Sequence, residues 1–173
     1  MTRRLILIAV CLAFPFSAFA GPKEDAQAVF DKFLTAATAA NIDEVVGLFA
    51  PEALFWGTTM RDLATTPDAI RQYFSPMSSR KPNEVKASAL GPSSALVLSD
   101  NTVLVSGMWQ TERMVDIKPT VTELRISIAV VKRGDRWLIA QFHNSRRPEP
   151  APATPPTREA EREVIWRMLP QLA

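Results

Sequence analysis

The sequence predicts an α+β protein, because helical and stranded patterns occupy different halves of the chain. In the first half, apolar residues recur at the spacing of amphipathic helices. From Asn83 onward this spacing gives way to long runs rich in β-branched residues, separated by short turns. This order favours helices that pack together on one face of an antiparallel sheet. We expect the sheet to be curved, with the helices on its concave face.

Two helices are predicted before Pro51. In "PKEDAQAVFDKFLTAATAAN" the larger apolar residues fall on one face of a helix from about Lys23 to Ala40. Asn41 breaks this helix, and the same spacing resumes in "NIDEVVGLFAPEA" until Pro51 ends the second helix.

A short strand and a third helix follow. The strand is predicted at "ALFWGT", where Gly57 interrupts the apolar run. The helix is predicted in "TTPDAIRQYFSPM", with Thr66 as its N-cap and Pro67 at its first position. Pro76 is expected to end it.

The second half is predicted to form four strands joined as an antiparallel meander. Turn sequences such as "SDN", "DIKP" and "RGD" separate the strands. The predicted strands are "EVKASALGPSSALVLS", "NTVLVSGMWQTERMV", "TVTELRISIAVVKR" and "RWLIAQFHNS".

The two ends of the chain are predicted to lie outside this domain. Residues 1–20 combine two arginines, an apolar run and the small residues "AFA", as a cleavable signal peptide does. We therefore expect cleavage after Ala20, a periplasmic or secreted mature protein, and no stable membrane anchor afterwards. The domain is predicted at residues 21–147, a proline-rich linker at 148–157 and an amphipathic helix at 158–173.

Removal of the leader changes the chemistry that the mature chain can support. Cys11 is the only cysteine, so no disulfide or cysteine metal site is expected after cleavage. The 20 Lys and Arg residues fall to 18 with the loss of Arg3 and Arg4, and so equal the 18 Asp and Glu residues. This balance gives no electrostatic reason to expect nucleic acid as a partner.

The ordered segments "LFAPEALFWGT", "TTPDAIRQYF" and "VVKRGDRWLIAQFHNSRRP" resemble a known family. The chain is similar, from about Lys23 to Pro148, to proteins with the cystatin-like cone fold of the nuclear transport factor 2 superfamily. It most resembles bacterial SnoaL-like proteins of the type labelled SgcJ/EcaC and the association domain of calcium/calmodulin-dependent protein kinase. The resemblance implies a pocket inside the cone and a homodimer formed through the outer face of the sheet.

The alternation of side chains along the last strand divides its residues into two sets. Trp137, Ile139, Gln141 and His143 point to one face, and the residues between them point to the other. The usual pattern of the family implies that the first set faces the pocket. The ligand pocket expected from the resemblance consists of Trp56, Tyr73, Trp109, Arg125, Gln141 and His143.

His143 is the only histidine, and three roles are open to it. As a general base it would need a group to orient it, for which Asp116 is the nearest acid in the sequence. As a metal ligand it would need carboxylates to complete the site, and we expect no metal. As a polar residue it would lie near the pocket rim or the dimer edge.

Two hypotheses about function follow. The first is an exported, dimeric small-molecule binding or interaction module without catalysis. The second is a lyase or isomerase acting on a hydrophobic carbonyl compound, with His143 as general base and Tyr73 or Arg125 stabilising the oxyanion. We expect no cofactor, because the sequence has no glycine-rich dinucleotide motif. The expected ligand is small and hydrophobic, or a carboxylate if Arg125 or Arg146 substitutes for the two arginines that the kinase association domain has where this chain has Ile128 and Asn144.

Overall fold

The computed structural model describes residues 21–115 and 118–150. The predicted signal peptide, Asp116, most of the predicted linker and the predicted C-terminal helix lie outside these residues. Within the described part of the chain, no helix has the length and apolar character needed to cross a membrane.

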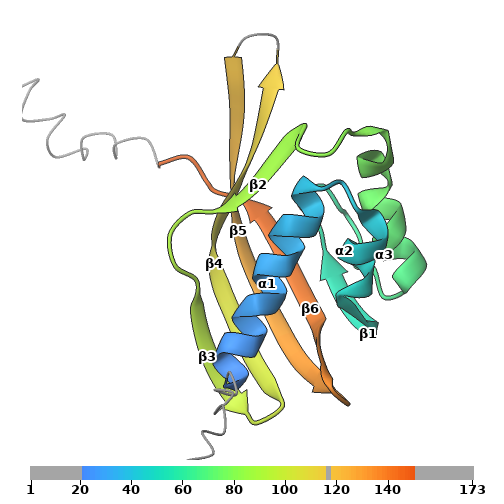
Figure 1. Cartoon of the computed structure of the whole chain (residues 1–173), viewed down its shortest axis with the longest axis vertical. Coiled ribbons are helices and arrows are strands. Elements are labelled where there is room, and N and C mark those ends of the chain that lie inside the picture. The colour runs from blue at the N-terminus through green and yellow to red at the C-terminus, as the bar shows by residue number, and fades with distance from the viewer. Residues whose placement is uncertain (1–20, 116–117, 151–173) are drawn as a thin grey trace, which may run out of the picture.

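Helix α1, Pro22–Thr38, is the longest helix of the described residues and lies across the concave face of the sheet (Figure 1). Pro22 occupies its first turn, where the missing N–H costs nothing, and Glu24 and Asp25 complement the positive end of the helix dipole. Its buried face carries Ala26, Val29, Phe30, Phe33, Leu34 and Ala36.

Helices α2, Ile42–Gly47, and α3, Pro67–Phe74, both begin at side-chain caps. The Asn41 side chain accepts a hydrogen bond from the Glu44 N–H, and the Thr66 hydroxyl accepts one from the Ala69 N–H. Asn41 therefore separates α1 from α2 and is also the N-cap of α2. The chain continues from α3 into a 3₁₀ helix, η1, Ser75–Ser79, which contains the proline predicted to end α3.

In the described residues, six strands form one sheet in the order β1-β6-β5-β4-β2, with β3 also paired to β4. β4, β5 and β6 are joined as the predicted antiparallel meander, whereas β1 runs parallel to β6 and makes the sheet mixed. The strands are β1 Phe49–Trp56, β2 Val85–Ala89, β3 Ser94–Ser99, β4 Thr102–Val115, β5 Lys118–Arg133 and β6 Arg136–Arg146.

The prediction of a single strand at "EVKASALGPSSALVLS" is wrong, because the chain turns in the middle of this run. Gly91 has a φ of 79°, a left-handed conformation that glycine adopts without steric cost. The turn separates β2 from β3, and the two strands pair with different parts of β4.

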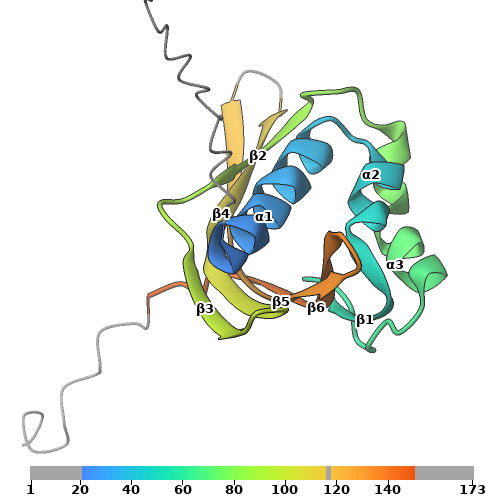
Figure 2. The same cartoon turned by 60° about the horizontal axis from the view of Figure 1, so that its bottom comes forward.

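The hydrophobic core fills the space between α1 and the curved sheet, with α2 and α3 closing one side (Figure 2). Its centre is aromatic. The centroid of the Phe142 ring lies 5.3 Å from the ring centroid of Phe33 and 4.9 Å from that of Phe55. Phe33 belongs to α1, Phe55 to β1 and Phe142 to β6, so these rings join the helical and sheet layers.

A β-bulge at Ala140 decides which side chains of β6 reach this core. Ile139 pairs with Val130 and Gln141 pairs with Ala129, so Ala140 has no partner on β5. The extra residue reverses the alternation of side chains after it. Ile139 and Phe142, which would face opposite sides of a regular strand, are consequently both in the core.

Candidate functional site

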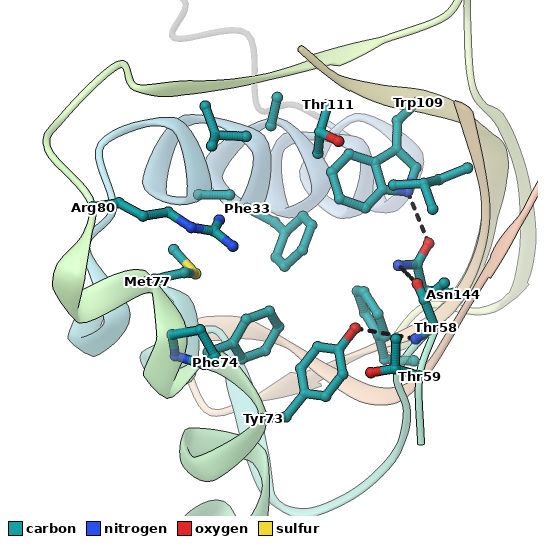
Figure 3. A pocket seen from close by; sticks show the side chains of 16 residues that line it. Phe33, Thr58, Thr59, Tyr73, Phe74, Met77, Arg80, Trp109, Thr111 and Asn144 are labelled. Carbon is teal, nitrogen blue, oxygen red and sulfur yellow. Dashed lines mark hydrogen bonds between the residues drawn. The ribbon is translucent and has the colours of Figure 1, made fainter. Parts of the chain in front are cut away.

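A cavity of about 280 Å³ lies inside the cone, between α1, the α3–η1 segment, and strands β2, β4 and β6 (Figure 3). Five aromatic side chains line it, and the polar groups among its lining residues come mainly from threonine, asparagine and arginine. The volume is just below the range of roughly 300–1,000 Å³ that ligand pockets usually have, so the space suits a small molecule. The aromatic lining residues are Phe33, Tyr73, Phe74, Trp109 and Phe142.

Asn144 is the only buried polar residue among those described, and it lines the cavity. Its Oδ1 accepts a hydrogen bond from Trp109 Nε1 at 3.0 Å, and its Nδ2 donates to Thr58 Oγ1 at 2.7 Å. The indole N–H can only donate, which fixes the orientation of the amide. The side chain retains one further N–H and one further lone pair for another partner.

Tyr73 reaches the cavity beside Asn144 (Figure 3). Its hydroxyl oxygen accepts a hydrogen bond from the Thr58 N–H at 3.1 Å, so its own proton remains available for donation. Gly57 makes room for the phenol ring, since a Cβ at this position would lie 2.2 Å from Tyr73 Cε2. Thr58 thus joins Tyr73 and Asn144 in one hydrogen-bonded cluster.

Arg80, at the end of η1, is the charged residue that lines the cavity, and its guanidinium points inward (Figure 3). The side chain is half-buried and takes part in none of the salt bridges found among the described residues. Its acidic neighbour Glu84 is already bound by the Lys81 N–H at 3.0 Å and by Arg113 at 2.9 Å. The Lys81 N–H, with Arg113 and Arg80, lowers the pKa of Glu84 despite partial desolvation.

The residues predicted for the pocket separate into two groups. Tyr73 and Trp109 line the cavity. Trp56, Arg125, Gln141 and His143 are not among its lining residues, and His143 and Arg125 are exposed. Contact of any of these six side chains with a ligand stays a prediction.

The predicted orientation of Gln141 and His143 toward the cone interior is wrong, because of the bulge at Ala140. Up to Ile139 the strand follows the predicted alternation, and Trp137 packs against the core. Beyond the bulge Phe142 and Asn144 point inward, and His143 lies on the outer face beside Ser127 and Trp56. Arg125 is on the same outer face, because Leu124 and Ile126 on either side of it are buried.

Asn144, Thr58 and Arg80 were not predicted as site residues. A bulge has no clear signal in "RWLIAQFHNS", so regular alternation assigns Asn144 to the wrong face. Arg80 follows the proline predicted to end α3, in a segment without helical or stranded periodicity. The large apolar side chain of Phe142, between the polar Gln141 and His143, is the one signal in the sequence against the predicted orientation.

Among the residues that the structure describes, those that line the cavity include no aspartate, glutamate or histidine. The neighbours of His143 across the sheet, Trp56 and Ser127, are not acids that would orient an imidazole for base catalysis. In residues 21–115 and 118–150, no group of three His, Cys, Asp or Glu side chains is placed to hold a metal ion. The arrangement provides apolar contact, hydrogen bonds and one positive charge.

Solved structures share this fold at low sequence identity. One, described as a calcium/calmodulin-dependent protein kinase II association domain from Xanthomonas campestris, is 23% identical with a TM-score of 0.64, over 76% of this chain and 94% of that chain. A nuclear transport factor 2-like protein with a cystatin-like fold from Novosphingobium aromaticivorans is 11% identical with a TM-score of 0.63, over 74% of this chain and 83% of that chain.

A third structure, described as a scytalone dehydratase and also from Novosphingobium aromaticivorans, is 11% identical with a TM-score of 0.62. The match covers 78% of this chain and 92% of that chain. Among curated proteins, none is significantly similar to this chain.

The cone of helices on a curved sheet, with a cavity inside it, defines a protein of the cystatin-like fold class. The family model described as "SnoaL-like domain" matches residues 26–149. The chain therefore belongs to the SnoaL-like domain family of the nuclear transport factor 2-like superfamily.

Proposed function

We propose that this protein binds a small, largely apolar molecule in the cone cavity and does not transform it. The observation that carries the proposal is the composition of the cavity wall: five aromatic side chains surround a few polar groups whose positions are fixed by hydrogen bonds. Small-molecule sites commonly combine an apolar enclosure with a few convergent polar groups that orient the ligand.

Binding is favoured over the alternative lyase or isomerase activity because of the groups that such chemistry requires. Proton abstraction next to a carbonyl needs a base within hydrogen-bond reach of the substrate. Within residues 21–115 and 118–150, the cavity lining has no carboxylate or imidazole, and His143, the proposed base, belongs to the outer face of the sheet. The hydrogen-bond donors at Tyr73 and Asn144 suit recognition of a ligand oxygen.

A cavity-filling variant tests the binding proposal. We would screen a library of small apolar metabolites by ligand-observed NMR against the wild type, Ala37→Phe and Ala28→Phe. Ala37 lines the cavity, whereas Ala28 is exposed on the same helix and serves as the matched control. Hits should bind the wild type and Ala28→Phe and lose binding to Ala37→Phe. Absence of any hit, or hits that Ala37→Phe retains, would contradict a ligand in this cavity.

We further propose that the protein is a homodimer that associates through the outer face of its sheet. Exposed apolar side chains lie on this face, among them Leu54, Trp56 and Leu96. One of the similar structures is described as an association domain, which supports self-association as the use of this surface.

Export through a cleaved signal peptide is part of the same proposal and rests on the pattern of residues 1–20. Expression of the full chain in a Gram-negative host, followed by intact-mass analysis of the periplasmic fraction and the medium, tests it. A mature protein that begins at Gly21 is expected. Retention of the complete chain in the cytoplasm would contradict export.

A further inference from the structure

We propose that the ligand is a bipolar anion: a small molecule with a carboxylate at one end, an apolar body, and a hydroxyl or carbonyl oxygen at the other end. The carboxylate would bind Arg80 and the distal oxygen would bind Tyr73 and Asn144. This inference rests on the proposed binding function and names the chemical class of its ligand.

The positive end of the cavity is formed by Arg80. A planar guanidinium presents several N–H donors in a geometry that matches a carboxylate. In the described part of the chain no carboxylate shares the cavity wall with it, and the Glu84 carboxylate is occupied by the Lys81 N–H and Arg113. Arg80 therefore has donors available for an anion that enters the cavity.

The opposite end is neutral and hydrogen-bonding (Figure 3). Tyr73 has a free hydroxyl proton, because its oxygen is the acceptor of the Thr58 N–H. Asn144 has one unused N–H and one unused lone pair, since Trp109 and Thr58 take the others. A ligand hydroxyl can both donate and accept here, and a carbonyl oxygen can accept from either group.

Aromatic rings separate the two polar ends. The Phe33 ring lies between Arg80 and the Trp109–Asn144 pair, and Phe74 lies on the opposite side of the cavity (Figure 3). Phe33 packs against Trp109 with ring centroids 5.7 Å apart and against Phe74 at 6.2 Å. These interlocked rings form an apolar middle section, which favours a ligand body such as one aromatic ring or a short aliphatic chain.

Three matched probes isolate the two polar contacts. 4-Hydroxyphenylacetate has both polar ends, 4-hydroxyphenylacetamide replaces the carboxylate by a neutral amide, and phenylacetate lacks the hydroxyl. We would measure their dissociation constants by calorimetric or NMR titration with the full mature chain. The acid should bind the wild type about tenfold more tightly than the amide, as expected for a charge-assisted hydrogen bond at a half-buried site. Phenylacetate should bind more weakly than the hydroxylated acid.

Variants of Arg80 test whether this side chain causes the preference for the acid over the amide. Arg80→Met removes the charge and keeps an unbranched side chain, so it should abolish the preference for acid over amide and leave amide binding within about twofold. Arg80→Lys should restore part of the preference. Arg71→Met is the control, because Arg71 is exposed on α3, is not a lining residue and pairs with Asp43.

The outcomes separate the two proposals. Equal binding of acid and amide to the wild type, or a preference that survives in Arg80→Met, would overturn the bipolar ligand and leave a neutral ligand in the cavity. Equal binding of phenylacetate and its hydroxylated form would overturn the distal contact with Tyr73 and Asn144. Failure of all three probes, together with failure of the library screen, would contradict the binding function itself.

Discussion

Asn144 illustrates how a buried amide can fix the position of several side chains at once. The residue is 6% exposed, and the indole N–H of Trp109 would have no described partner without it. The same amide holds Thr58, whose backbone N–H holds the Tyr73 hydroxyl. The polar end of the cavity is thereby organised before any ligand arrives, which reduces the entropy lost on binding.

We predict that Asn144→Leu lowers the free energy of unfolding by about 1–3 kcal/mol, because it leaves the Trp109 N–H buried without an acceptor. Urea denaturation of the single variant, of Trp109→Phe and of the double variant measures the coupling. The double variant should lose less stability than the two single losses combined, since phenylalanine has no N–H to satisfy. Strictly additive losses would argue against the role of this hydrogen bond.

Gly57 is required by the ring of Tyr73. We predict that Gly57→Ala lowers the free energy of unfolding by about 1–3 kcal/mol, because the added methyl group must displace the phenol. Gly47 is the matched control: a Cβ there meets no atom within 4 Å, and Gly47→Ala should cost nothing or stabilise the helix by up to about 1 kcal/mol. Equal losses of stability in Gly57→Ala and Gly47→Ala, measured by urea denaturation, would contradict a clash between residue 57 and the Tyr73 ring.

At the scale of elements, strand β6 joins the two halves of the fold. It pairs in parallel with β1 and antiparallel with β5, and it contributes Phe142 to the core and Asn144 to the cavity. Both contributions depend on the bulge at Ala140, which keeps Ile139 and Phe142 on the same face of the sheet. The bulge thus determines both the packing of the core and the chemistry of the cavity.

Insertion of one alanine between Gln141 and Phe142 should be far more damaging than a substitution at Ala140. With the Gln141–Ala129 pair kept, the inserted residue would take the inward position, and Phe142 and Asn144 would turn outward. We predict a loss of at least about 4 kcal/mol in the free energy of unfolding, or failure to fold, by circular dichroism and urea denaturation. Ala140→Ser keeps the length of the strand and should cost less than about 1 kcal/mol. An insertion variant with near-normal stability would show that the register of β6 does not fix these orientations.

At the scale of the whole molecule, the two faces of the sheet differ in what covers them. The concave face is covered by α1, whereas the outer face has no helix packed on it in the described residues (Figure 2). Leu54 is 44% exposed and belongs to a row of paired residues that crosses the outer face through Gln141, Ala129, Leu104 and Leu96. Association through this face would remove this apolar surface from water.

We predict that Leu54→Glu converts the dimer to a monomer, because it places a charge within the proposed interface. Val97→Glu is the matched control, since Val97 is 46% exposed but points to the opposite face of β3 from Leu96. Sedimentation velocity of both variants and the wild type measures the outcome. A wild type that sediments as a monomer, or equal behaviour of the two variants, would contradict dimerisation through the sheet.

The sequence by itself determined the α+β class, the division into a helical first half and a stranded second half, and the resemblance that the SnoaL-like family match confirms. The class and the division into two halves follow from local periodicity, because apolar residues recur every 3.6 residues in an amphipathic helix and every two residues in a strand. The resemblance to the family also pointed to Tyr73 and Trp109, which line the cavity.

Only the tertiary structure decided which side of β6 supplies the cavity and where the cavity's positive charge lies. A one-residue bulge changes the direction of every side chain after it, but the only mark of the unpaired Ala140 on the sequence is the apolar Phe142 between two polar residues. For the same reason His143, the most conspicuous residue of the sequence, lies on the outer face, and Asn144 lies in the cavity. Arg80 reaches the cavity from η1 through the packing of that segment against the cone, a long-range contact that local periodicity cannot encode.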